Sequence, residues 1–302
     1  MRKTLVEQPV APPQPLLGQA RRAKLRRRLL TEVVAHALLI AVAALFLIPF
    51  FWLVITALKP LNQVFTNPII WWPSPPQWDN FAKVMSSPAF PFARLLSNTL
   101  FYTILSTIGV TLSSALVAYP FARMSFRGKE TLFGITLATM MLPGVVTLIP
   151  TYILFRTLGW VGGYAPLIVP VWFGSAFNIF LLRQFMLTIP QDLTDAARVD
   201  GASDFGIFWR IMLPLIRSAL IVVALLHFLY AWNDFMGPLI YVTQAENYPL
   251  VVGLYAFLAR FSVQWHLLMA ASLIVTAPVL LLFFMAQRYF IEGVTMTGLK
   301  GA

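Results

Sequence analysis

Six long apolar stretches divide this sequence and constrain its fold more than any other feature. They cover residues 33–58, 95–122, 131–155, 164–182, 213–242 and 267–287. Each is long enough to cross a bilayer, because a hydrocarbon core of about 30 Å needs roughly 20 residues of α-helix. Backbone in lipid must satisfy its own hydrogen bonds, and the stretches lack the alternating pattern of barrel strands. The sequence therefore predicts an all-α polytopic membrane protein with six transmembrane helices.

The composition excludes several other classes of protein. Hydrophobic residues make up 59% of the chain and charged residues 11%, whereas soluble domains are roughly 45–50% apolar and about 25% charged. The chain has no cysteine, which rules out disulfides and thiolate metal sites. His36, His227 and His266 are far apart and lack ligand spacing. We therefore expect no metal site and no cofactor.

The distribution of basic residues predicts the orientation in the membrane. With a cytoplasmic amino terminus, 17 of the 22 lysines and arginines fall on the cytoplasmic side. This bias places both termini in the cytoplasm. We interpret the net charge of +11 as a topology signal and not as a nucleic-acid footprint, although the basic leader can also contact anionic membrane lipid.

Three regions follow from these patterns. Residues 1–32 form a basic cytoplasmic leader, expected to be largely disordered because prolines are concentrated in residues 9–15. The leader is not a secretory signal, since the apolar stretch 33–58 exceeds a signal core of roughly 7–15 residues. Residues 33–290 form the six-helix domain, and residues 291–302 form a cytoplasmic tail.

A charged loop between the fourth and fifth stretches, residues 188–212, is the main candidate functional segment. Pro190 and Asp192 suit the start of a short helix, and Gly201 suits its end. Ser203 or Asp204 can cap a second helix, before Pro214 opens the fifth span. The small residues of the first helix leave room for another backbone to approach. A solvated connector is the alternative interpretation, favoured for Asp192 and Asp204 taken singly.

The loop resembles the cytoplasmic signature of binding-protein-dependent ABC importer permeases, which have the MetI/MalG-like fold. The matching pattern is Asp195-Ala196-Ala197, three residues, Gly201, nine residues, then Ile211-Met212-Leu213-Pro214. Asp195 stands where the family usually has Glu. The resemblance implies a coupling helix that docks on a separate ATPase, with contact residues Asp195, Ala196, Ala197, Asp200, Gly201, Ile211 and Pro214.

Other motifs are similar to the carbohydrate branch of that family, the MalG-like permeases. They are Trp72-Pro73, Asp79-Asn80-Phe81, Asn98-Thr99-Leu100, Trp232-Asn233-Asp234-Phe235, Pro238-Leu239 and the tail residues Gly293, Thr295, Lys300 and Gly301. The resemblance implies import of a sugar or related polar solute across a bacterial inner membrane. It also implies three partners: a MalF-like second permease, a cytoplasmic ATPase dimer and an extracytoplasmic solute-binding protein that contacts residues 60–91 and 243–265. Sugar, sugar alcohol and glycerol phosphate remain open as solutes.

The fifth stretch contains Asp234, the one carboxylate that falls clearly inside a predicted span. A charge in the membrane is costly, so such residues usually face a cavity or a partner. We expect Trp232, Asn233 and Asp234 to line the translocation pathway or its outer gate. The alternative is a polar knot that stabilises packing between permease subunits.

The chain lacks the phosphate-binding loop of nucleotide hydrolases. Its one Gly-Lys pair, Gly128-Lys129, continues into Glu130 instead of Ser or Thr. We therefore expect a transport subunit and not an enzyme, driven through alternating access by ATP hydrolysis elsewhere. The alternatives are an ion-coupled secondary transporter, which usually has midplane ionisable groups and inverted repeats, and a membrane scaffold without transport activity.

Overall fold

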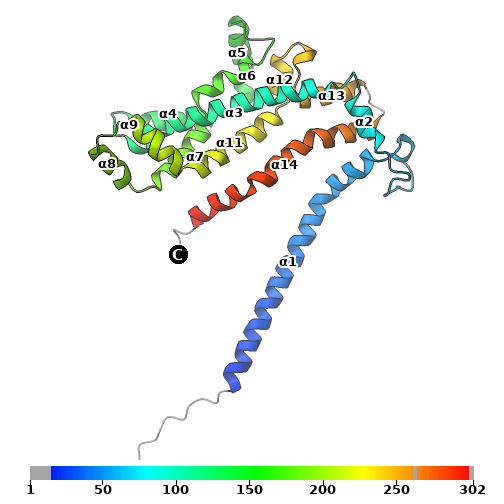
Figure 1. Ribbon diagram of the computed structural model, residues 1–302, viewed down its shortest axis with the longest axis horizontal. Coiled ribbons are helices and arrows are strands. Elements are labelled where there is room, and N and C mark those ends of the chain that lie inside the picture. Colours follow the sequence, from blue (N-terminus) through cyan, green and yellow to red (C-terminus); the bar gives the residue numbers. More distant parts are fainter. Residues whose placement is uncertain (1–14, 261–263, 299–302) are drawn as a thin grey trace, which may run out of the picture. The chain divides into compact units, whose positions relative to one another are not determined.

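The computed structural model describes the backbone of residues 15–260 and 264–298, and the side chains of residues 28–259 and 264–287. All regular elements in these ranges are helical (Figure 1). Four helical segments are long and apolar enough to cross a membrane, and two bent helix pairs raise the number to as many as six. The all-α prediction is thus confirmed. The chain divides into two compact units, residues 1–55 and 56–302.

The first unit is built on α1, Pro15–Ala57, which runs two residues into the second unit. Its candidate membrane span is Arg28–Ala57. The helix begins well before the predicted apolar stretch, so residues 15–32 of the leader are helical instead of disordered. Leucine, arginine, lysine and alanine dominate this part, and they are strong helix formers. Residues 1–14 lie outside the described residues.

The second unit contains the remaining helices. Its α-helices are α2 (Asp79–Met85), α3 (Phe92–Arg123), α4 (Lys129–Thr139), α5 (Gly144–Thr157), α6 (Ala165–Ile168), α7 (Ala176–Leu187), α8 (Asp192–Val199), α9 (Asp204–Ile207), α10 (Leu213–Leu215), α11 (Arg217–Trp232), α12 (Met236–Tyr241), α13 (Leu250–Arg260) and α14 (Trp265–Gly298). Single helical turns form η1 (Leu61–Gln63), η2 (Pro170–Phe173), η3 (Phe208–Met212) and η4 (Ala245–Asn247).

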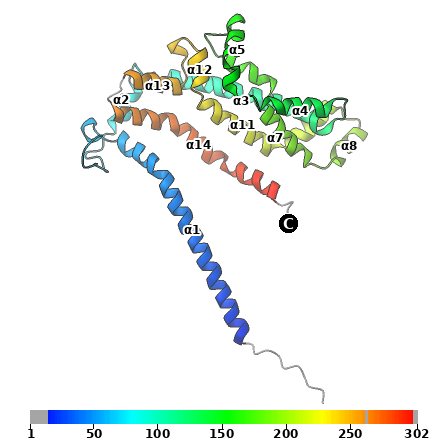
Figure 2. The ribbon, with the colours of Figure 1, turned by 180° about the vertical axis from the view of Figure 1, so that it is seen from behind.

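Helix α3 is the centre of this second unit. It packs along both α7 and α11, and α11 in turn packs against α14 (Figures 1 and 2). Helices α8 and α9 lie at one end of α3, and α2 and α13 lie near its other end (Figure 1). The end with α8 and α9 is named the coupling end, after the predicted coupling helix, and the opposite end the outer end, after the predicted external segments.

Two of the predicted spans are bent and not continuous. The third consists of α4 and α5, which meet at 95° around Pro143. The fifth bends by 78° before Arg217. Pro214 was expected to open this span, but it lies in α10, ahead of the bend. Proline has no N–H and clashes with the turn before it, where the π-helical turn η3 lies, and the bend itself falls at Ile216, after Pro214.

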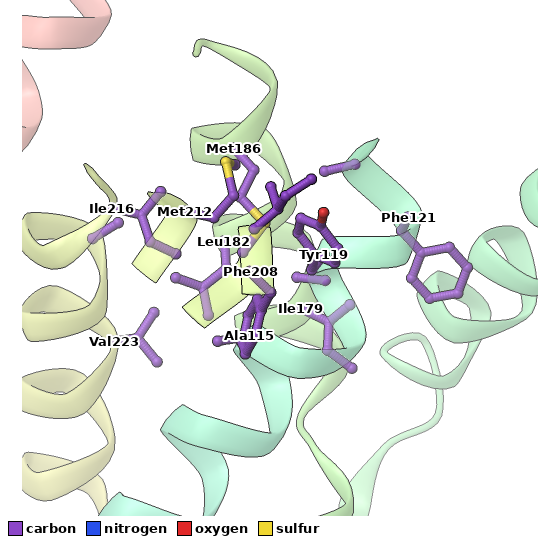
Figure 3. Packing of buried hydrophobic residues seen from close by; sticks show 14 of the residues in the cluster. Ala115, Tyr119, Phe121, Ile179, Leu182, Met186, Phe208, Met212, Ile216 and Val223 are labelled. Carbon is purple, nitrogen blue, oxygen red and sulfur yellow. The ribbon is translucent and has the colours of Figure 1, made fainter. Parts of the chain in front are cut away.

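Each end of the second unit has its own apolar cluster. At the coupling end, buried side chains of α3, α7, α11 and η3 converge, among them Tyr119, Leu182, Met186, Phe208 and Met212 (Figure 3). The outer cluster joins α2, α3, α11, α13 and α14. Helix α14 continues to Gly298, so the predicted tail is helical to that residue. Lys300 and Gly301 lie outside the described residues.

Candidate functional site

The coupling-end segment forms the helix, turn and helix that the sequence predicts. Asp192 and Asp195 occupy the first turn of α8, where a negative charge complements the helix dipole. Gly201 has φ +80°, a left-handed conformation that glycine adopts without strain, and it follows the end of α8. Ser203 caps α9 by accepting a hydrogen bond from the Gly206 N–H at 3.2 Å.

Only part of the predicted docking set lies on the surface. Thr194 and Ala197 are buried, because residues three apart share one helix face and this face packs on the rest of the unit. Ala197 therefore points into the coupling-end cluster. The exposed members of the set on and just after α8 are Asp195, Ala196, Asp200 and Gly201.

Ile211 and Pro214 lie apart from this exposed surface. Ile211 is half-buried and packs against the coupling-end cluster, whereas Pro214 is exposed in α10. Between α9 and α10, Ile207, Phe208 and Met212 are buried in that cluster (Figure 3 labels the last two). This second part of the signature therefore anchors the segment to the unit.

Apolar residues outside the predicted docking set are also exposed at this end. Val199, at the end of α8, is 88% exposed, and Leu193 is also exposed. On the next helical segment, the exposed rings of Phe205 and Trp209 stack with centroids 6.4 Å apart. In the sequence, these residues could have been recognised as apolar side chains within a charged loop. Exposed apolar groups of this kind commonly mark contact surfaces.

Arg198 fixes the angle between α8 and α9. Its Nη1 donates to Asp195 Oδ1 and its Nη2 to Asp204 Oδ1, both at 3.1 Å. The hydrogen bond to Asp204 is the main cause that raises the pKa of Arg198, so the guanidinium is charged at every physiological pH. Because these groups are partly exposed, each ion pair contributes little stability, about 0–1 kcal/mol. Their effect is to set geometry.

The outer-end candidate Asp234 lies in the turn between α11 and α12 and bonds to α3 and α12 of the same subunit. Its Oδ2 accepts from the Tyr102 hydroxyl of α3 at 3.0 Å, and its Oδ1 accepts from the Gly237 N–H of α12 at 3.1 Å. Tyr102 also stacks on Tyr164, which precedes α6, at 5.5 Å. The carboxylate is half-buried. The arrangement is a polar knot within one subunit.

The other two pathway candidates point elsewhere. Trp232 is 2% exposed, and its Nε1–H donates to the Val275 carbonyl of α14 at 3.3 Å. Asn233 is exposed and donates from Nδ2 to the Leu229 carbonyl at 2.7 Å. Helix α11 ends at Trp232, so the three consecutive residues face different sides. A pathway role for them stays a prediction, and Asn233 is the member with an exposed side chain.

A groove of about 1090 Å³ runs between α3, α11 and α14. Its lining is almost entirely apolar and includes Phe228, Trp232 and Leu281. Binding of a polar solute needs convergent hydrogen-bonding groups, which this lining does not provide. The groove therefore suits lipid or another helix and not a sugar.

Comparisons with known proteins cover most of the chain. Residues 109–295 match the family model described as "Binding-protein-dependent transport system inner membrane component". The chain is 34% identical to a probable ABC transporter permease protein of Pyrococcus horikoshii, over 89% of this chain and 97% of that one. It is 33% identical to the arabinooligosaccharides transport system permease protein AraQ of Bacillus subtilis, over 85% and 92%.

Two further matches extend the comparison. The sn-glycerol-3-phosphate transport system permease protein UgpE of Yersinia pestis is 30% identical, over 87% of this chain and 95% of that one. A solved bacterial ABC transporter involved in the import of the acidic polysaccharide alginate contains a chain with a similar fold. That match has a TM-score of 0.77 at 23% identity and covers 88% of this chain and 98% of the other.

Proposed function

Because the chain belongs to the binding-protein-dependent transport system inner membrane components, we propose that it docks on a separate ATPase through the exposed surface of α8. Membership makes it a permease subunit of an ABC importer, whose ATP hydrolysis resides in another subunit. The observation that carries the docking proposal is the exposure of Ala196 on a short helix, and of Gly201 just after it, at one end of the unit. Small residues there permit close approach of a partner backbone.

The elements at the two ends of α3 support one orientation of the complex in the membrane. The ATPase is cytoplasmic, so α8 faces the cytoplasm in this proposal, and both chain termini lie on the same side of a bacterial inner membrane. The elements at the outer end, α2 and α13, then belong to the external segments 60–91 and 243–265 (Figure 2). These segments contact the solute-binding protein. Exposed Phe65, Trp71 and Trp72 supply apolar area for that contact.

A second permease subunit completes the pathway in this proposal. ATP binding favours one conformation of the paired permeases, and hydrolysis restores the other, which is alternating access. The docked α8 passes the displacement to the membrane helices. An ion-coupled secondary transporter, the alternative that the sequence left open, needs no ATPase, and family membership decides against it.

The solute in this proposal is a sugar, an oligosaccharide or glycerol phosphate. The support is the naming of two relatives as permeases of arabinooligosaccharide and sn-glycerol-3-phosphate transport systems. Equilibrium binding of these three solute classes to the partner solute-binding protein identifies the class. Binding of none of them would remove this part of the proposal.

Gly201→Asp tests the docking surface. A Cβ at this position meets nothing within 4 Å, so the subunit itself accommodates the side chain at the cost of a strained φ. The new carboxylate instead obstructs a docked partner. We expect uptake to fall about tenfold or more, since each 1.4 kcal/mol of lost docking free energy is tenfold in affinity.

Gly128→Asp is the matched control. Gly128 also has a left-handed φ, +86°, with nothing within 4 Å of a Cβ, but it precedes α4, whereas Gly201 follows α8. Uptake should stay near the wild-type rate in this variant. Equal uptake by the Gly201→Asp variant and wild type, at equal amounts in the membrane, would contradict docking at α8 and favour a scaffold role for this segment.

A further inference from the structure

Arg123, the last residue of α3, makes three side-chain hydrogen bonds at the coupling end. It is 6% exposed. Its Nη1 donates to Gln191 Oε1 at 2.8 Å, and its Nη2 donates to the carbonyls of Ile189, at 2.6 Å, and of Met186. Both carbonyls lie at the carboxyl end of α7, where the helix dipole favours a cation. Arg123 therefore joins the end of α3 to the end of α7 and to the residue that precedes α8.

The backbone of the same residue contacts the other end of α8. The Arg123 carbonyl accepts from Nη2 of Arg198, in the last turn of α8, at 3.4 Å. Gln191 stands directly before α8 and Arg198 near its end. One residue of α3 thus holds both ends of the exposed helix.

Apolar packing alone does little to orient α8. Of its eight residues, only Thr194 and Ala197 are buried. A short helix with so small a buried face can tilt at little cost, because hydrophobic stabilisation scales with the area removed from water. The hydrogen bonds to Arg123 supply the missing directional restraint. The planar guanidinium holds several acceptors in fixed geometry, which a lysine cannot reproduce.

Helix α3 extends this link to the far end of the unit. At its coupling end it is held by Arg123, and near its outer end Tyr102 donates to Asp234. Between these points it packs along α7 and α11. A displacement of α8 that reaches Arg123 is thus delivered to the helix that contacts both ends.

We propose that Arg123 is a positioning residue that transmits the displacement of the docked α8 to α3. The inference rests on the proposed docking of α8 to an ATPase. It assigns Arg123 no contact with ATP or solute. Without its hydrogen bonds, α8 still docks, but its movement is absorbed by tilting of α8 and not passed to the membrane helices.

Arg183 provides a matched control within the same region. It also bonds to the end of α3, since its Nε donates to the Phe121 carbonyl at 3.0 Å. Its guanidinium carbon lies 4.2 Å from the ring centroid of Phe133. Arg183 is a partly buried arginine that donates to a backbone carbonyl of α3, and neither of these contacts reaches α8.

The experiment compares Arg123→Gln, Arg123→Lys and Arg183→Gln in the complete transporter, reconstituted in liposomes with its solute-binding protein. The measured quantity is ATP hydrolysed per solute imported, together with the amount of ATPase bound. We expect Arg123→Gln to retain bound ATPase but to raise the ratio about fivefold or more, within the range of allosteric coupling free energies. Arg123→Lys should be intermediate, and Arg183→Gln should keep the wild-type ratio even if its thermal stability falls.

A second variant covers the case in which Arg123→Gln does not assemble. Gln191→Ala removes the acceptor of Nη1 at an exposed position and should raise the ratio in the same direction. An unchanged ratio in Gln191→Ala and in every assembled Arg123 variant, or an equal rise in Arg183→Gln, would overturn the inference. If the wild-type permease binds no ATPase, the proposed docking function fails instead, so the two failures are distinguishable.

Discussion

The coupling end and the outer end of the second unit are stabilised in different ways. At the coupling end, Arg123, Arg183 and Arg198 donate to backbone carbonyls and to carboxylates. At the outer end, the Tyr102 hydroxyl donates a hydrogen bond directly to the Asp234 carboxylate. At the coupling end, Arg123 and Arg198 restrain α8, whose own buried face is small, whereas the Tyr102–Asp234 contact joins α3 to the turn before α12.

Glycines show the same difference. A Cβ on Gly253, in α13, would lie 2.5 Å from Leu95, whereas a Cβ on Gly201 meets nothing within 4 Å. The outer end leaves no room for a methyl group at this position, and the coupling end leaves α8 open for a partner. In the proposed function, the open position at Gly201 belongs to the surface that receives the ATPase, whereas Gly253 lies where α13 packs on α3.

The largest expected effect on stability comes from Gly253→Ala. The added methyl overlaps the buried Leu95 side chain, and overpacking of this kind costs about 1–3 kcal/mol. The midpoint of thermal unfolding of the purified transporter should fall. Gly134→Ala is the matched control in a helix, because α4 leaves its Cβ position open and glycine weakens a helix interior.

The decisive observation is that the two substitutions change the free energy of unfolding in opposite directions. Gly134→Ala should raise the free energy of unfolding by roughly 0.5–1 kcal/mol, whereas Gly253→Ala lowers it. If both substitutions were stabilising, the contrast in packing between the two regions would not hold.

A smaller effect is expected from breaking the Tyr102–Asp234 pair. Tyr102→Phe removes the donor and Asp234→Asn removes the charge from the acceptor. Each should cost about 0.5–1.5 kcal/mol, the net contribution of a typical hydrogen bond. A double-mutant cycle on thermal unfolding should give a coupling energy of about 0.5 kcal/mol or more between the two side chains.

The same variants separate packing from a pathway role. If Asp234 acts through packing, uptake per assembled complex and solute preference stay unchanged in Asp234→Asn. Altered solute preference at normal stability would instead support the predicted place of Asp234 in the pathway.

Much of the fold was predictable because membrane helices are specified by long apolar stretches, which are local in sequence. The bends were not, since Pro143 and Pro214 permit a break and the surrounding packing determines its angle. Helix α8 was predictable from Asp192 and Gly201, which act on their immediate neighbours. Which face of α8 is buried was not, so Ala197 was expected on the docking surface.

The arginine contacts lay further beyond sequence reasoning. Arg123 and Gln191 are 68 positions apart, and no local pattern connects them. From the sequence, these arginines served only to predict the orientation of the chain in the membrane. The arginines meet their partners only because α3 and α7 lie side by side in the fold.

Site-specific cross-linking tests the docking of α8 most directly. The chain has no cysteine, so each introduced cysteine is the only one in this subunit. Val199→Cys places a thiol at a position of α8 that is 88% exposed, and Thr194→Cys places one on its buried face as a control. In membrane vesicles carrying the whole transporter, Val199→Cys should cross-link to the ATPase subunit and Thr194→Cys should not. Labelling of Val199→Cys from the external side, with no ATPase cross-link in an actively importing transporter, would contradict the account.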